Sequence, residues 1–346
     1  MDTKKESPEY IRTSLAAAMT LGLVNGSFKD DVRLTGLNLL LTYENGCLGR
    51  CAYCGISVKE RPKNKKTFIR VKWPVYSMDK VLEVLKEKEK DFERVCISMV
   101  TRKRALEDAI DITARIKKVT DLPVSLLISP TVIGSPDFLV QSKKAGADMI
   151  GVAIDAATRR LFDKLRGRDV NGPHSWDRYW KVLQWSAEVF GRDKTGVHLI
   201  CGIGETDREM VDAILRAEKM GAKTHLFSFY PEAGTLLEGL GPPDLVRYRK
   251  IQIARYLINE RGTGARPILF SADGSISGFD HDLDSLLSDG KAFMTSGCPC
   301  RDSDITACNR PLANERPRDP FRNYPHLPTK RQLKVIEEQI KGLERR

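Results

Sequence analysis

The sequence predicts an α/β protein built as a (β/α)8 TIM-type barrel, complete or nearly so. Eight short apolar runs alternate with segments of helical periodicity, and no linker divides the 346 residues into separate domains. Because each helix returns the chain to the same edge of the sheet, we expect the strands to be parallel. Chemistry in such a barrel lies at the carboxyl ends of the strands.

The predicted strands are rich in leucine and β-branched residues, and most are bounded by Gly, Pro or Asp. They are Leu37–Tyr43, Arg94–Val100, Val124–Ile128, Met149–Ile154, Val197–Ile203, Thr224–Tyr230, Pro267–Phe270 and Ala292–Thr295. The predicted helices repeat their apolar residues at three and four positions. They are Ser7–Leu23, Met78–Lys88, Ala105–Lys118, Leu139–Ala145, Trp176–Phe190, Glu209–Met220 and Leu245–Glu260.

Three regions are expected along the chain. Residues 1–35 form an N-terminal helical extension, residues 36–297 form the barrel, and residues 298–346 form a C-terminal segment that binds a metal cluster and ends in a tail. A proline-rich strap, Pro311–Pro328, precedes a final charged helix.

Composition excludes several protein classes. With 41% apolar and 30% charged residues, the chain is neither disordered nor collagen-like. No uncharged stretch is long enough to span a membrane, and the N-terminus lacks the apolar core of a secretion signal, so a cytoplasmic location is expected. The net charge of +11 favours acidic partners, although its spread along the chain is more typical of a solvated surface than of a nucleic-acid site.

The distribution of the eight cysteines is the most informative feature. In the cytosol, metal or catalytic roles are more common for cysteines than disulfides. Cys47, Cys51 and Cys54 directly follow the first strand, and in a compact loop their spacing can aim three thiolates at one point. Three ligands on a four-iron cluster leave one iron open for another molecule. The alternative is a zinc site completed by a distant ligand.

The segment CLGRCAYC, with Tyr53 before the last cysteine, resembles the signature of the radical S-adenosylmethionine (SAM) enzymes. The resemblance implies a [4Fe–4S] cluster on Cys47, Cys51 and Cys54, whose open iron chelates SAM. It also implies that an electron from the cluster cleaves SAM to methionine and a 5′-deoxyadenosyl radical, which abstracts a substrate hydrogen.

Further SAM contacts are implied by matching residues. Tyr53 matches the aromatic residue beside the adenine, and Asp155 matches the acidic residue that holds the ribose. The segment GVHLICGIGETDRE is similar to the glycine-rich strand end of biotin synthase-like members, which implies that Gly202 and Gly204 admit the adenosine and that Glu205 lies beside it. The alternatives are a tight turn for the glycine-rich segment and a helix N-cap for Asp155.

The second predicted strand departs from the family pattern. It ends in ISMVTRK rather than in the motif that binds the SAM amine, so we expect Ser98 and Thr101 to substitute for that motif. Arg166 and Arg168 are candidates for the SAM carboxylate on charge alone, and surface arginines are the alternative.

A second group of cysteines follows the eighth predicted strand. Cys298 and Cys308 are expected at the barrel mouth, where Cys96 of the second strand can join them, with Cys300 as an alternative ligand. We therefore expect these thiols to converge on an auxiliary [4Fe–4S] cluster, because thiolates held together are the ligands that such clusters use. The alternative for Cys96 is core packing, and Cys201 is expected in the core.

Two histidines in neighbouring strands, His198 and His225, are expected to be core residues rather than ligands.

Five further segments, SLAAAMTLGL, FIRVKWP, VNGPHSWDRYW, THLFSFYPE and GCP…ACNRP…NERP, together resemble the archaeal two-protein lipoyl synthases. The resemblance implies sulfur insertion at the sixth and eighth carbons of an octanoyl chain on a protein lysine, with the auxiliary cluster as sulfur donor. The implied partners are an acidic lipoyl-carrier protein bearing octanoyl-lysine, a companion radical SAM component and a low-potential electron donor. SFYP and Trp176–Trp180 are expected to line the passage for the acyl-lysine arm.

Two other functions stay open at this point. One is a biotin synthase-like or methylornithine synthase-like enzyme that acts on a small molecule. The other is a non-catalytic metal-binding protein that binds RNA through its basic surface, and its affinity would fall steeply with salt.

Overall fold

A mostly parallel sheet of eight strands forms the centre of the protein, in the order β10-β9-β8-β7-β6-β2-β1-β5. The structure is a computed structural model that describes residues 4–28, 32–56, 67–282, 288–302, 305–315, 319–341 and the backbone of residues 344–345. The parallel strands are β2 (Gly36–Leu41), β6 (Arg94–Ser98), β7 (Val124–Ile128), β8 (Ala147–Asp155), β9 (Thr195–Cys201) and β10 (Lys223–Ser228).

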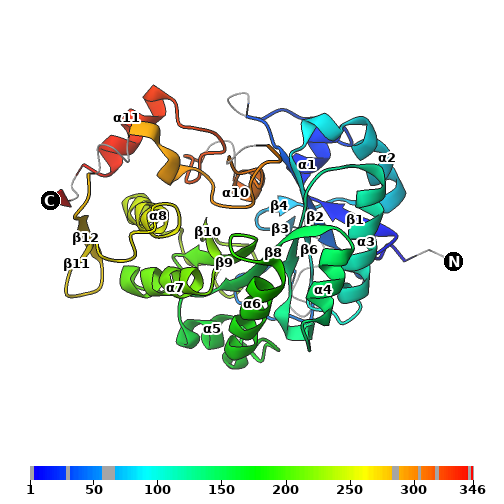
Figure 1. Cartoon of the computed structure of the whole chain (residues 1–346), viewed down its shortest axis with the longest axis horizontal. Helices are drawn as coiled ribbons and strands as arrows, with labels where there is room; N and C mark the ends of the chain where they lie inside the picture. The colour runs from blue at the N-terminus through cyan, green and yellow to red at the C-terminus, as the bar shows by residue number, and fades with distance from the viewer. Residues whose placement is uncertain are drawn as a thin grey trace.

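Helices between these strands cover the outer face of the curved sheet (Figure 1). They are α2 (Met78–Glu87), α3 (Ala105–Val119), α4 (Asp137–Lys144), α5 (Arg159–Leu165), α6 (Trp176–Phe190), α7 (Asp207–Lys219) and α8 (Leu245–Asn259). All residues of β2 and β6 are buried, as expected for parallel strands that are covered on both faces. The α/β barrel-type architecture is therefore confirmed, together with six of the eight predicted strands.

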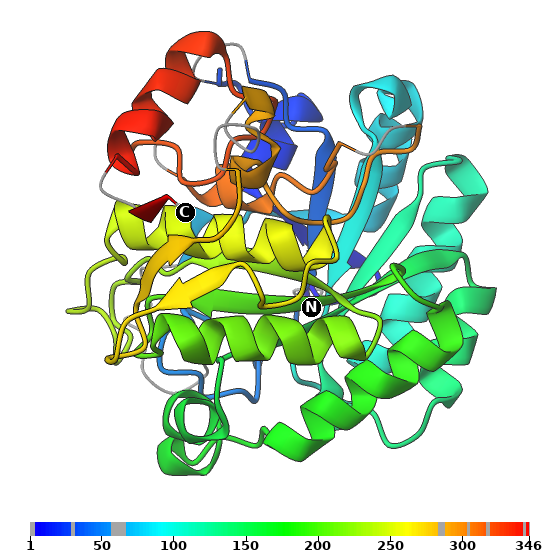
Figure 2. The ribbon, with the colours of Figure 1, turned by 60° about the vertical axis from the view of Figure 1, so that its left-hand side comes forward.

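Local sequence sets the ends of several helices. The Ser77 hydroxyl accepts a hydrogen bond from the Lys80 backbone N–H and begins α2. Thr206 and Glu209 form a capping box at the start of α7. Figure 2 shows α7 and α8 side by side, and the two helices are in contact.

The last two predicted strands do not join the central sheet. The expectation of eight barrel strands was therefore wrong for these two segments. Residues Ile268–Phe270 form β11, which pairs with β12 (Ile276–Phe279) in a separate small sheet together with β13 (Glu344–Arg345). The cause is local: Gly274 has a φ of +84° and Asp273 accepts the Ser275 N–H, so the chain turns back on itself as a hairpin.

The eighth predicted strand is a short 3₁₀ turn over Lys291–Phe293. The turn begins at Gly290, whose φ is +65°. In the described residues, β10 and β5 are the two ends of the central sheet, so strand pairing does not close the barrel there.

The N-terminal region also differs from the predicted single helix. Tyr10–Thr13 form β1, which pairs antiparallel with β2 and with β5 (Val75–Ser77). The helix α1 is restricted to Leu15–Thr20, because Ser14 caps it and accepts the Ala17 N–H. Hydrogen bonding of β1 to a strand on each side, β2 and β5, outweighs the helical pattern of residues Tyr10–Thr13. A short hairpin of β3 (Thr67–Phe68) and β4 (Val71–Lys72) precedes β5.

The C-terminal segment packs against the amino ends of the parallel strands. The Arg94 guanidinium binds Asp148 at 2.7 and 3.0 Å, the Ser125 hydroxyl at 2.9 Å and the Pro299 carbonyl at 2.8 Å. A Cβ on Gly36 would lie 2.6 Å from the Ala307 carbonyl oxygen, so this contact requires glycine.

The segment then continues through α10 (Arg310–Asn314), which lies between β10 and the N-terminal strands (Figure 1), and ends with α11 (Lys330–Gln339). Among the described residues, no helix has the length and apolar character needed to cross a membrane.

We predict that Arg94→Leu lowers the free energy of unfolding by about 3 kcal/mol, because it breaks a buried ion pair and leaves the Pro299 carbonyl without its donor. Urea denaturation measures this change. Arg104→Leu is the control, since the Arg104 side chain is 53% exposed and its ion pairs should contribute less than about 1 kcal/mol. Equal losses in the two variants would contradict the anchoring role of Arg94.

Candidate active site

A cavity of about 230 Å³ lies at the carboxyl ends of the parallel strands. Its walls come from all six of these strands or the loops after them, and from the C-terminal segment. Eight of the residues predicted for the SAM and cluster site line it together: Cys47, Cys51, Tyr53, Cys54, Ser98, Thr101, Asp155 and Arg166. This position agrees with the location of active sites in α/β barrels.

The cysteine loop after β2 is joined by backbone hydrogen bonds to the end of α5 and to the loops after β6 and β10. The Leu48 N–H donates to the Thr101 carbonyl at 3.1 Å, and the Ala52 N–H donates to the Leu165 carbonyl at 2.7 Å. The Leu237 N–H donates to the Ala52 carbonyl at 3.1 Å. These hydrogen bonds fix the backbone of the loop that carries Cys47, Cys51 and Cys54.

The thiols of this loop differ in their surroundings. Cys47 Sγ accepts hydrogen bonds from the backbone N–H groups of Gly49 and Thr101, both at 3.2 Å. Burial raises the pKa of the Cys51 thiol to about 11, and the nearby Arg166 guanidinium opposes this rise. A metal centre that replaces the thiol proton would relieve the cost of this burial.

In the part of the chain that the structure describes, no three His, Cys, Asp or Glu side chains are already arranged to hold a metal ion. The fit of an iron–sulfur cluster rests on the donor set instead. Three thiols from one loop line the same cavity, and thiolates are the ligands that such clusters use. The triplet Cys47, Cys51 and Cys54 fits this group.

Asp155, Arg166 and Tyr53 form one hydrogen-bonded unit on the cavity wall. Asp155 Oδ2 accepts from Tyr53 Oη and from Arg166 Nη1, both at 2.6 Å. Arg166 Nη2 also donates to Tyr179 Oη at 3.2 Å, whereas its buried Nε has no partner. Thr158, rather than Asp155, caps α5, so the N-cap alternative for Asp155 is excluded.

The predicted substitutes at the end of β6 are both engaged with protein partners. Ser98 Oγ accepts from Arg310 Nη1 at 2.8 Å, and the Thr101 hydroxyl lies 2.9 Å from the Ser129 hydroxyl. Arg168 is on the surface, with a side chain 80% exposed, and pairs with aspartates. It does not line the cavity, which favours the surface alternative for this residue.

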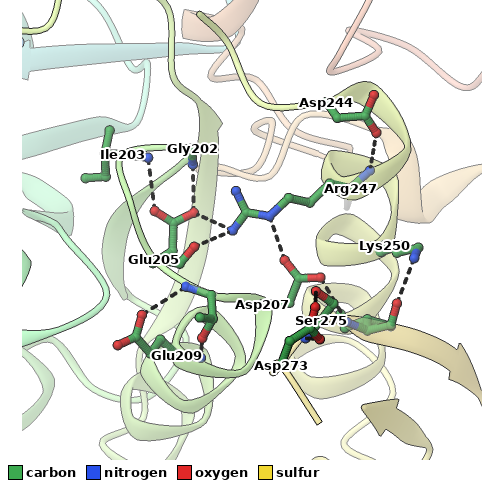
Figure 3. Close-up of polar contacts among 12 residues, drawn as sticks. Gly202, Ile203, Glu205, Asp207, Glu209, Asp244, Arg247, Lys250, Asp273 and Ser275 are labelled. Carbon is green, nitrogen blue, oxygen red and sulfur yellow. Dashed lines mark hydrogen bonds and ion pairs between the residues drawn. The ribbon is translucent and has the colours of Figure 1, made fainter. Parts of the chain in front are cut away.

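The glycine-rich turn after β9 lies outside the residues that line the cavity. Gly202 and Gly204 have φ values of +101° and +115°, so the turn does require glycine. The Glu205 carboxylate accepts from the N–H groups of Gly202 at 2.7 Å and Ile203 at 3.0 Å and closes its own turn (Figure 3). These contacts explain the glycines and the Glu205 carboxylate by the geometry of the turn, and a contact of this turn with SAM stays a prediction.

Arg247 completes this turn from α8. Its guanidinium pairs with Glu205 at 2.9 Å and with Asp207 at 2.7 Å, and the Glu205 side chain is 0% exposed (Figure 3). The Glu205 carboxylate is thus fully engaged in joining β9 to α7 and α8.

Cys96, Cys298 and Cys308 are all buried, and the structure brings them together. Cys96 and Cys308 are hydrogen-bonded to each other, and this bond lowers the pKa of Cys96. Cys298 and Cys308 pack with Met149 of β8. The three thiols are not part of the cavity wall, so the expected position at the barrel mouth was wrong.

The reason for this position is the anchoring of the C-terminal segment at the amino ends of the strands. Cys96 precedes the cavity-lining Ser98 by two residues on β6, so the two side chains share one face of the sheet. The cysteine group therefore lies in the barrel interior, one layer of side chains below the cavity.

Cys201 and Cys300 are the remaining two cysteines, and His198 and His225 lie side by side on the neighbouring strands β9 and β10. Cys300 lies in a turn in which its backbone N–H donates to the Ile305 carbonyl at 2.7 Å. Cys201 lies within β9, and burial raises the pKa of its thiol. The rings of His198 and His225 lie 5.1 Å apart. Burial lowers the pKa of His225 to about 4 and that of His198 well below its usual value, so both are neutral near pH 7.

Sequence reasoning missed the polar residues that reach the cavity from distant segments. Arg310, Glu232 and Glu315 all line it, and only the folding of the C-terminal segment and of the loop after β10 brings them there. Tyr230 of the predicted SFYP lining is on the wall, whereas Trp176 and Trp180 pack in the core.

Comparison with known proteins identifies the family of this chain and proteins with a similar fold. The model of the radical SAM superfamily matches residues 42–217. The solved structure of methylornithine synthase (PylB) is 15% identical over 70% of this chain and 66% of that chain, with a TM-score of 0.50. HydG, a maturase of the [FeFe]-hydrogenase, is 15% identical over 72% of this chain and 53% of that chain, with a TM-score of 0.52.

The chain thus spans less than two thirds of either structure, and at this identity the likeness concerns the fold alone. A search of curated proteins gives no match.

We predict that Glu205→Gln lowers the free energy of unfolding by about 2 kcal/mol, because the amide cannot accept both backbone N–H groups and removes the charge that pairs with Arg247. Thermal unfolding measures the loss. Glu209→Gln is the matched control in the same turn, since glutamine also forms a capping box. A Glu205→Gln protein as stable as the control would show that the turn does not depend on this carboxylate.

Proposed function

The chain belongs to the radical SAM superfamily, and we propose that it inserts sulfur into an octanoyl chain carried on a protein lysine, as one component of a two-protein lipoyl synthase. Membership of the superfamily implies a [4Fe–4S] cluster and SAM. The proposal adds the sixth or eighth carbon as the site of sulfur insertion and an auxiliary cluster as the sulfur donor.

Cys47, Cys51 and Cys54 are the residues that would hold the [4Fe–4S] cluster, which when bound supplies the electron that cleaves SAM and yields the 5′-deoxyadenosyl radical. In this proposal the unit of Asp155 and Tyr53 orients the SAM ribose and adenine. The unpartnered Arg166 Nε is a donor available to the SAM carboxylate.

The observation that carries the sulfur-insertion proposal is the meeting of Cys96, Cys298 and Cys308 beneath the cavity. These thiols would hold an auxiliary iron–sulfur cluster that is consumed as the sulfur source and is therefore a substrate. An enzyme that only rearranges carbon would need no second thiol group. Three buried cysteines from two distant segments support a site with ligands rather than chance core packing.

The cavity between the two cysteine groups suits an alkyl chain. Its walls include Leu40, Leu127, Ile200 and Phe227 from four strands. Apolar side chains at this position exclude water from a reactive carbon radical. The Arg310–Ser98 hydrogen bond lies between the cavity and the deeper thiols, because Ser98 lines the cavity and Arg310 is close to Cys96 and Cys308.

The proposed partners follow from the same reaction. The octanoyl-lysine would be presented by an acidic lipoyl-carrier protein, which the net charge of +11 would attract. A companion radical SAM component would insert the other sulfur, and a low-potential donor would supply electrons.

We predict that Cys51→Ala abolishes SAM cleavage, whereas Cys308→Ala retains cleavage but loses sulfur insertion. Each protein is reconstituted anaerobically with iron and sulfide and incubated with SAM, reductant and an octanoyl-lysyl peptide, with and without the companion protein. Chromatography measures 5′-deoxyadenosine, and mass spectrometry measures the thiolated peptide. Cys201→Ala is the matched control, because this buried cysteine lies in β9 away from both groups and both products should persist.

Two results would refute the proposal. One is 5′-deoxyadenosine formation by the wild type without thiolated peptide under either condition. The other is normal sulfur insertion by Cys308→Ala.

We predict that Asp155→Asn weakens SAM binding about tenfold, because the neutral amide accepts the ribose hydroxyls less strongly than the carboxylate does. Asparagine tolerates the φ of +66° at this position, so the fold should persist. Anaerobic equilibrium dialysis of the reconstituted protein measures the affinity. The exposed Asp169→Asn is the control, and equal affinities in the two variants would remove Asp155 from the SAM site.

A further inference from the structure

One wall of the cavity concentrates buried polar atoms that have no hydrogen-bond partner. They are Tyr230 Oη, Asn314 Oδ1 and both carboxylate oxygens of Glu315, and all three residues line the cavity. Most buried polar groups in proteins are paired, because an unpaired one costs about 1–3 kcal/mol. Several such atoms on one wall indicate that a ligand supplies their partners.

Two arginines lie next to this wall, near the Tyr230 ring, although neither lines the cavity itself. The Arg70 guanidinium lies 3.8 Å from the centre of the Tyr230 ring, and that of Arg322 lies 5.7 Å from it. Arg70 Nε and Arg322 Nη1 are buried and have no partner. The other Arg70 nitrogens bind Asp319 at 2.9 Å and the Asn314 carbonyl at 3.0 Å, which fixes the guanidinium beside the ring.

Glu315 differs from the other glutamate of the cavity. The Glu232 carboxylate accepts from the Thr67 hydroxyl at 2.6 Å and from the Arg70 backbone N–H, so the protein itself satisfies it. Burial raises the pKa of Glu315 to about 8, and the attraction of Arg70 offsets this rise only in part. The backbone of Arg322 also lowers this pKa, but neither carboxylate oxygen has a hydrogen bond of normal geometry, so the buried group can still accept from a ligand.

The mixture of charges on this wall restricts the chemistry of the ligand. An anionic group would face the Glu315 carboxylate, and a cationic group would face Arg70 and Arg322. A neutral group with both a donor and an acceptor can satisfy the free atoms without either conflict. A carboxamide has this combination, since its N–H donates and its carbonyl accepts.

We propose that Glu315, Tyr230 and Asn314 form a polar subsite that binds the amide group joining the acyl chain to the lysine of the substrate. The amide N–H donates to the Glu315 carboxyl group or to the Asn314 side-chain oxygen, and the amide carbonyl accepts from the Tyr230 hydroxyl. This assignment rests on the proposed function, and it makes the amide the point at which the enzyme holds its substrate while the alkyl chain occupies the apolar part of the cavity.

The test compares an octanoyl-lysyl peptide with an analogue in which an ester oxygen replaces the amide N–H. Affinities for the reconstituted protein with SAM are measured anaerobically by titration calorimetry. The wild type should bind the amide at least about tenfold more tightly than the ester, because a site built to bind N–H rejects an analogue that lacks it. Glu315→Leu should reduce this ratio to about one, and Glu337→Leu on the exposed face of α11 should leave it unchanged.

Tyr230→Phe keeps the test decisive if thermal unfolding shows that Glu315→Leu does not fold. Loss of the hydroxyl should weaken binding of both the amide and the ester severalfold, because both carry the carbonyl. Equal affinity of the wild type for amide and ester would overturn the subsite and leave the proposed function standing. Failure of the SAM-cleaving wild type to bind either compound would refute the proposed function itself.

Discussion

The anchoring of the C-terminal segment by Arg94 is the interaction on which the rest of the site depends. This buried guanidinium joins the starts of β6, β7 and β8 to the Pro299 carbonyl, next to Cys298. Because six parallel strands are found among the described residues and their pairing does not close a barrel, the interior of the sheet is covered by another element, the C-terminal segment. Once anchored, the segment brings Cys308 to Cys96, Arg310 to Ser98 and Glu315 to the cavity.

This arrangement places the two cysteine groups at two different levels along the strands. The triplet Cys47, Cys51 and Cys54 lines the cavity at the carboxyl ends of the strands, and the second thiol group lies below the cavity, toward their amino ends. A radical formed near the triplet would therefore meet the substrate before it could reach the deeper thiols. In the proposed reaction this order matters, since hydrogen abstraction precedes sulfur transfer.

The sequence was sufficient for features that local patterns determine. The helices α2, α3, α6 and α8 follow their apolar periodicity, and the cysteines of the triplet line the cavity, as their position after the first strand predicts. It failed where two local preferences compete or where distant segments meet. The turn at Asp273 makes a hairpin of a predicted barrel strand, and nothing near Glu315 in the sequence indicates its place on the cavity wall.

The central claim is that one chain holds two iron–sulfur sites, and the iron and sulfide content of the anaerobically reconstituted wild type tests it most directly. Two four-iron clusters predict about eight iron atoms and eight sulfides per chain. Replacing Cys96 and Cys308 together should reduce both values to about four while SAM cleavage persists. A wild type that saturates at about four irons would contradict the claim.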